Sequence, residues 1–123
     1  MENTKIKSFT DLIGWQEGHR LVLLIYKVTS FFPKAEYSLI DQMKRCAVSI
    51  TSNIAEGFSR KSKKEKMQFY YMALGSTTEL QNQLVISRDL RFMSIKDFDD
   101  VAQQTIRLHK LINGLIKSSR SYT

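Results

Sequence analysis

Four serines, each followed three residues later by an acidic residue, divide this sequence into four segments. In such a pair the two side chains satisfy backbone N–H groups that the first turn of a helix leaves unpaired, so the spacing is a helix-start signature. The pairs are Ser8–Asp11, Ser38–Asp41, Ser62–Glu65 and Ser94–Asp97. A fifth pair, Ser76–Glu79, lies inside a periodic run and is interpreted as a false positive. The sequence therefore predicts four helices.

Apolar residues after each start recur every three or four positions, as on one face of a helix, and no segment alternates with the period of a strand. Pro33, the single proline, is expected to end the first helix, and Gly57 is expected to cap the second in the left-handed conformation. The predicted helices span approximately residues 10–32, 38–57, 63–90 and 95–117.

Short connections between long helices favour antiparallel neighbours. We therefore predict an all-α fold, an up-down-up-down antiparallel four-helix bundle that forms a single domain over residues 1–123. Four glycines fall inside the predicted helices, where they mark either close helix approach or simple tolerance of a residue that costs about 1 kcal/mol relative to alanine. They are Gly14, Gly18, Gly75 and Gly114.

The formal net charge of +7 favours an anionic partner such as RNA, DNA or an acidic membrane face. Membrane binding is the weakest of these, because the basic residues cluster at one helix end rather than along a face. After Asp100 the chain has no acidic residue. A single cysteine, Cys46, excludes an intrachain disulfide, and the N-terminus lacks the apolar core of a signal peptide, so we expect a cytoplasmic protein.

No catalytic motif is recognisable in the sequence. A glycine-rich phosphate loop, H-E-x-x-H and G-x-S-x-G are all absent, and neither His19 nor His109 follows an arginine at the spacing that helical arginine–histidine nucleases need. Cys46 lies on an apolar stripe, as a buried and inert thiol would. We expect no enzyme activity, no catalytic residue, no metal site and no cofactor.

Polar residues on the second predicted helix share one face beside its apolar stripe. They are Gln42, Arg45, Ser49, Asn53 and Glu56, and a similar line on the third helix consists of Ser76, Glu79 and Gln83. Because no histidine or cysteine nucleophile is placed among them, a hydrogen-bonded network between helices or between subunits is favoured over an active site.

Five basic residues surround the expected start of the third helix. They are Arg60, Lys61, Lys63, Lys64 and Lys66. Cations at a helix N-terminus oppose its macrodipole at a cost of about 0.3–1 kcal/mol each, but together with the unpaired N–H groups they form an anion site. We predict that these five bind nucleic-acid phosphates; the alternative is a solvated loop that aids solubility. The flanking Phe58, Phe69, Tyr70 and Tyr71 could stack on bases, although helical spacing places most of them in the core.

Several short motifs together resemble a known family. They are D-L-x-x-W at Asp11–Trp15, F-P at Phe32–Pro33, Gln42 with Arg45, S-I-T-S-N-I-A-E-G at Ser49–Gly57, Arg60, and G-S-T-T-E-L at Gly75–Leu80. The chain resembles, over about Ser8 to Leu115, the bacterial four-helix bundle family named after the 23S rRNA intervening-sequence protein. Thr51 stands where proline is common in that family, and Gly18 where alanine is frequent.

The resemblance implies a ring-like homopentamer, without catalytic residues, related to the accessory variability protein of diversity-generating retroelements. It implies as partners the protein itself, RNA or DNA, and a reverse transcriptase or ribosomal component. The signature positions would form the polar network of the second and third helices or a subunit interface: Arg45, Ser49, Asn53, Glu56 and Glu79. The leading hypothesis is a non-enzymatic homo-oligomer that binds nucleic acid, RNA above all; the alternative is a protein-interaction scaffold with no direct nucleic-acid role.

Overall fold

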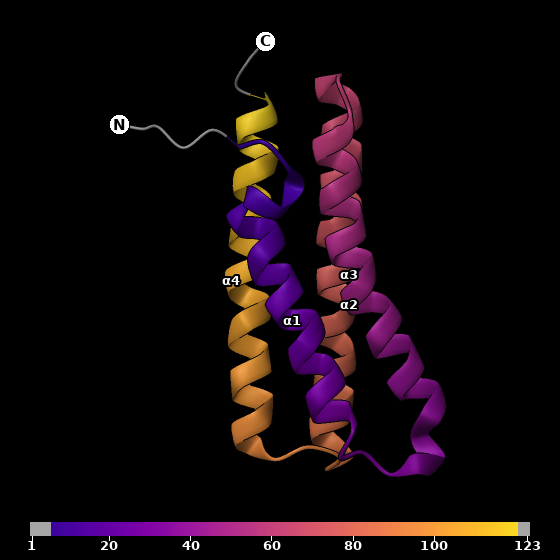
Figure 1. Ribbon diagram of the computed structural model, residues 1–123. Helices are drawn as coiled ribbons and strands as arrows, with labels where there is room; N and C mark the ends of the chain where they lie inside the picture. Colours follow the sequence, from indigo (N-terminus) through magenta and orange to yellow (C-terminus); the bar gives the residue numbers. More distant parts are fainter. Residues whose placement is uncertain (1–5, 121–123) are drawn as a thin grey trace.

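The computed structural model describes residues 6–120, which form four long helices and two short 3₁₀ turns (Figure 1). The elements are η1 (Phe9–Asp11), α1 (Ile13–Thr29), η2 (Lys34–Glu36), α2 (Tyr37–Ser59), α3 (Lys63–Asp89) and α4 (Ile95–Arg120). Successive helices run in opposite directions, and residues 6–120 contain no strand. The prediction of an all-α four-helix bundle is confirmed.

The helix-start signature is right for two of the four helices. The backbone N–H of Glu65 donates to Ser62 Oγ at 3.1 Å, and that of Asp97 donates to Ser94 Oγ at 3.0 Å. The pair at Ser8 closes a capping box on η1, so α1 begins three residues later than predicted, at Ile13. The prediction for Ser38 is wrong, because α2 begins at Tyr37 and continues directly from η2 without a side-chain cap.

The two predicted helix ends at Pro33 and Gly57 also differ in the structure. Helix α1 ends at Thr29, and the N–H groups of the next residues bond to carbonyls three residues back as the helix tightens. Helix α2 continues through Gly57 to Ser59, and no glycine between residues 6 and 120 has a positive φ. The prediction of a left-handed glycine cap is therefore wrong, and the reason for Gly57 lies in packing.

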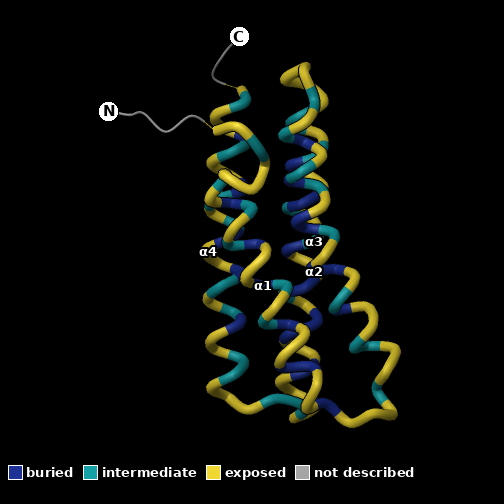
Figure 2. Tube along the Cα trace, in the orientation of Figure 1, coloured by how far each residue is buried: buried dark blue, intermediate teal, exposed yellow. Residues whose placement is uncertain are grey.

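All four helices contribute to one apolar core, which lies along their facing sides (Figure 2). Its fully buried members include Leu21, Ile25, Met43, Ile50, Ile54, Leu80, Val101, Leu108 and Ile112. Buried hydroxyls are satisfied within their own helices: Thr29 Oγ1 donates to Ile25 O at 2.7 Å and Thr77 Oγ1 to Ala73 O at 2.9 Å. In the described part of the chain, no helix has the length and apolar character that a bilayer crossing requires.

The glycines inside helices divide into two kinds. A Cβ on Gly57 would lie 2.5 Å from Tyr70 Cε1, and one on Gly18 would lie 2.9 Å from Thr51 Cγ2, so these glycines allow helices to approach closely. Gly14 is also buried, and a Cβ on it would lie 3.3 Å from Leu115 Cδ1. A Cβ on Gly75 or Gly114 would meet no heavy atom within 4 Å, so these two are only tolerated.

Candidate nucleic-acid interface

The polar stripe joins α2 to α3 through three of its members. Ser49 Oγ lies 2.9 Å from Ser76 Oγ, and Asn53 Nδ2 donates to Ser49 O at 2.9 Å and to Ser49 Oγ at 3.1 Å. Cys46 adds a further bond, because its thiol donates to Ser76 O at 3.0 Å. These contacts fix the register of the two helices where their backbones approach.

The other members of the stripe do not join this network. Arg45 and Glu56 each form an ion pair with a residue four positions away in the sequence: Arg45 with Asp41 at 2.8 Å, and Glu56 with Arg60 at 2.9 Å. The side chains of both pairs are accessible to solvent. Gln42 and Glu79 are exposed at the rim of a shallow groove of about 270 Å³. Gln83 is buried, and its Oε1 has no hydrogen-bond partner among residues 6–120.

Cys46 shares this groove but is poorly suited to nucleophilic chemistry. It is 6% exposed, and burial, followed by the nearby Glu79 carboxylate, raises the pKa of its thiol to about 11. The thiolate is the reactive form, so the protonated thiol that prevails at neutral pH is a weak nucleophile.

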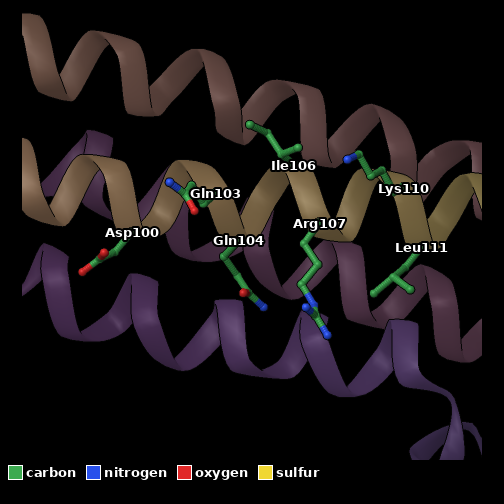
Figure 3. Close-up of a pocket in the computed structure, with 7 residues that line it drawn as sticks. All are labelled: Asp100, Gln103, Gln104, Ile106, Arg107, Lys110 and Leu111. Atoms are coloured by element: carbon green, nitrogen blue, oxygen red, sulfur yellow. The ribbon is translucent and has the colours of Figure 1, made fainter.

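A second hollow runs along α4 beside α1, has a volume of about 940 Å³ and is open to solvent (Figure 3). Gln104 and Arg107 extend from it toward α1, where Gln104 Nε2 donates to Glu17 O at 2.9 Å and Arg107 Nε lies 3.2 Å from Glu17 Oε1. Its carboxylate, Asp100, pairs with Lys96 at 2.9 Å. Gln104 and Arg107 thus tie α4 to α1, while the Asp100 pair lies within α4, and residues 6–120 hold no cluster of three potential metal ligands.

Lys66, one of the five predicted phosphate ligands, is directed at the end of α2 instead. Its Nζ donates to Phe58 O at 2.7 Å and to Gly57 O at 3.2 Å, and burial lowers the pKa of the ammonium group. The last carbonyls of a helix lack backbone partners and carry the negative end of its macrodipole. Lys66 therefore caps α2 and is not directed outward as a phosphate ligand would be.

Arg60 is also engaged within the chain. Its Nη2 lies 2.9 Å from Glu56 Oε2, and its guanidinium lies 4.8 Å from the centre of the Phe69 ring. Its Nε is buried without a hydrogen-bond partner in the described residues. The remaining members of the predicted cluster, Lys61, Lys63 and Lys64, are exposed.

The fold adds basic residues that the prediction did not assign to the site. Because α3 and α4 are antiparallel, the end of α4 lies at the same end of the bundle as the α2–α3 turn (Figure 1). Residues 57–68 and 110–120 together carry eight basic residues and one acidic residue, a formal charge of +7. We call this region the basic end; its exposed cations include Lys61, Lys63, Lys64, Lys117 and Arg120.

The opposite end of the bundle has a different charge. Residues 30–41 and 86–100, which form the α1–α2 and α3–α4 connections and the turns beside them, carry six acidic and four basic residues, a formal charge of −2. The charge of the chain is thus concentrated at one end. The sequence indicated these additional basic residues only through the absence of acidic residues after Asp100. That the end of the chain lies beside the predicted cluster depends on which helix ends meet in the fold.

Exchanging Lys66 for methionine tests its role as a cap. We expect Lys66→Met to lower the free energy of unfolding by about 1 kcal/mol, because α2 loses charged hydrogen bonds at its C-terminus. Lys64 is exposed and lies two residues before Lys66, so Lys64→Met should change the free energy of unfolding by less than about 0.5 kcal/mol. Urea unfolding of both variants provides the measurement, and equal losses would contradict the assignment.

Comparisons with known proteins agree with this fold. A crystal structure of a protein of unknown function from the S23 ribosomal protein family of Bacteroides thetaiotaomicron superposes with a TM-score of 0.79 at 17% sequence identity, covering 85% of this chain and 96% of that one. Among curated proteins, none matches the chain. The model of the 23S rRNA-intervening sequence protein family matches residues 10–114, and the chain belongs to that family.

Proposed function

We propose that this protein is a homo-oligomer that binds the phosphate backbone of nucleic acid, RNA in particular, through the basic end of its bundle. The observation that carries the proposal is the concentration of a formal charge of +7 in residues 57–68 and 110–120. Phosphate contacts supply most of the sequence-independent affinity for nucleic acids, and exposed lysines and arginines make them.

Two features of the basic end favour phosphate over a protein carboxylate. The N-terminus of α3 adds the positive end of a helix macrodipole beside Lys61, Lys63 and Lys64. Lys117 and Arg120 lie on the last turns of α4, so that two separate helix ends carry cations at the same end of the bundle (Figure 1). An extended polyanion can contact both groups, whereas one acidic side chain reaches only one of them.

Self-association is the second part of the proposal. Tyr71, Met72, Val85 and Ile86 lie on the outward side of α3 and are between 39% and 51% exposed. They form two exposed apolar pairs, separated along α3 by the exposed Thr78, Glu79 and Asn82, and exposed apolar patches are typical of surfaces that have a protein neighbour. A homopentamer, which the family resemblance implies, would repeat the basic end in every subunit, and weak phosphate contacts would add through multivalency.

The test is the binding of a labelled RNA hairpin and a DNA hairpin of matched sequence, titrated from low to near-physiological salt, with the oligomer mass recorded in the same buffers. We expect RNA to bind, with a logarithmic affinity that falls linearly with the logarithm of salt concentration. The triple variant Lys61→Gln, Lys63→Gln and Lys64→Gln should weaken binding at least tenfold and lower the salt slope by about one unit per lysine.

A control triple variant at the opposite end, Lys27→Gln, Lys34→Gln and Lys96→Gln, removes the same charge. It should retain most of the affinity, because these three exposed lysines lie away from the basic end. Equal weakening by the two triples would mean that only net charge matters and would contradict the site. No binding by the unaltered protein at low salt, with the oligomer intact, would favour the protein-interaction scaffold.

A further inference from the structure

Three aromatic side chains near the start of the chain contact one another in a row, which we call the ladder: Phe9 and His19 are exposed, and Trp15 between them is partly buried against the core. The rings of Trp15 and His19, one turn apart on α1, are stacked with their centres 4.9 Å apart and their planes inclined by 14°. The ring of Phe9, from η1, meets Trp15 edge to face at 5.3 Å. Phe9 fastens η1 to α1 through this contact, and His19 is the exposed end of the stack.

The ladder lies on the side of α1 that faces α2. Gly18 packs against Thr51 of α2, and further along the same side Lys44 of α2 lies 4.6 Å above the ring of Tyr26. Residues three or four apart share one side of a helix, so Trp15, His19 and Tyr26 follow this edge in order. The start of α1 lies toward the basic end (Figure 1).

His19 gives the ladder an open terminus. The side chain is exposed, and its only ring contact within residues 6–120 is the one with Trp15. One face of the imidazole is therefore covered by an aromatic ring, and the other has no ring against it. A flat, exposed, pre-stacked ring is the kind of platform on which single-stranded nucleic acids place their bases.

The charges near the ladder are compatible with a polyanion. Beyond His19 a groove of about 360 Å³ lies between α1 and α2, and Tyr26, Lys44, Arg45 and Ser52 contribute to its walls. Its carboxylate, Asp41, is paired with Arg45. Glu17 and Asp11 are the acidic residues nearest to the ladder in sequence. Glu17 is held by Gln104 and Arg107 on the α4 side of α1, and Asp11 Oδ2 accepts hydrogen bonds from the backbone N–H groups of Lys7 and Ser8.

We propose that the Phe9–Trp15–His19 ladder is a stacking platform for unpaired nucleobases, so that the nucleic acid held at the basic end has a single-stranded segment that continues along the α1–α2 groove. The inference rests on the proposed function and specifies its ligand. In a duplex each internal base is already stacked on both sides within its own strand, so an unpaired base is the one best able to extend the ladder.

The test compares three labelled RNAs of equal length and charge at one low salt concentration: a single strand, the same strand with a central run of abasic sites, and a hairpin whose loop nucleotides are abasic. We expect the protein to bind the base-bearing strand about tenfold more tightly than the abasic strand. Trp15 is the only tryptophan, so its fluorescence should be quenched by the base-bearing strand and much less by the abasic one.

Variants of His19 separate stacking from phosphate binding. His19→Ala removes the outer ring of the ladder and should weaken binding of the base-bearing strand while leaving hairpin affinity unchanged, whereas His19→Phe should keep the preference because it keeps a flat ring. His109→Ala is the matched control, since His109 lies on α4 and its Nδ1 contacts Asn113 at 3.2 Å. We expect it to change none of the three affinities.

The outcomes distinguish this inference from the proposed function. If none of the three RNAs binds, the proposed function fails. If all three bind equally and His19→Ala has no effect, phosphate binding stands and the platform is overturned. If His19→Ala instead changes the oligomer mass, the ladder is a contact between copies of the chain, which also overturns it.

Discussion

Replacing Gly57 with alanine is expected to lower the free energy of unfolding by about 3 kcal/mol, the largest effect of the five possible glycine-to-alanine changes, because its added Cβ makes the closest approach to a neighbour. A Cβ at this position would lie 2.5 Å from Tyr70 Cε1, 2.8 Å from Tyr70 Cδ1 and 3.2 Å from Phe69 Cβ. Tyr70 is 3% exposed and cannot swing into solvent without leaving a cavity. The backbones of α2 and α3 must therefore move apart next to the turn that carries the basic end.

Urea unfolding measures this effect, and Gly75→Ala is its control. Gly75 lies in the middle of α3 with no heavy atom within 4 Å of an added Cβ, so alanine should stabilise the protein by about 0.5–1 kcal/mol through helix propensity. In a Tyr70→Ala background the cost of Gly57→Ala should largely disappear. A cost at Gly57 that persists without the ring would show that something other than this contact requires glycine.

The number and order of the helices were predictable from the sequence, because capping pairs and apolar periodicity are local properties. The role of Gly57 was not. A glycine near a predicted helix end is typical of a left-handed cap, and only the position of Tyr70, on another helix, shows that this one permits close packing. The spacing of residues within α2 carries no information about which side chain of α3 packs against Gly57.

The candidate site was predictable in part for the same reason. The five basic residues were predicted to form an anion site because they lie at the N-terminus of α3, where cations oppose the macrodipole. Yet α2 ends in the same turn, and its C-terminal carbonyls draw in Lys66 at 2.7 and 3.2 Å. Arg60 likewise turns back to Glu56. The contribution of Lys117 and Arg120 depends on the antiparallel packing of α4 against α3, which no local pattern contains.

Gly18 and Thr51, the two positions where the chain departs from the pattern of the family it resembles, contact each other across the α1–α2 interface. Thr51 Oγ1 donates to Val48 O at 3.0 Å, which holds the side chain so that its methyl group points at α1. A Cβ on Gly18 would lie 2.9 Å from that methyl carbon, while the nearest atom of Leu108 would be 3.7 Å away. Threonine at one position thus accounts for glycine at the other.

This pairing predicts a strong coupling between two substitutions. Gly18→Ala alone should lower the free energy of unfolding by about 2 kcal/mol, because Thr51 is buried and its hydroxyl is bonded to Val48 O, which resists movement of the methyl group. In a Thr51→Ser background, which keeps the hydroxyl and removes the methyl, Gly18→Ala should instead be neutral or stabilising by up to about 1 kcal/mol.

A double-mutant cycle by urea unfolding measures the coupling, with an expected interaction energy of about 2 kcal/mol. Gly114→Ala serves as the control: a Cβ on Gly114 meets no heavy atom within 4 Å, so this substitution should show no interaction energy with Thr51→Ser. If Gly18→Ala costs the same with serine as with threonine at position 51, Leu108 and not Thr51 sets the limit on α1. The two departures from the family pattern would then be independent of each other.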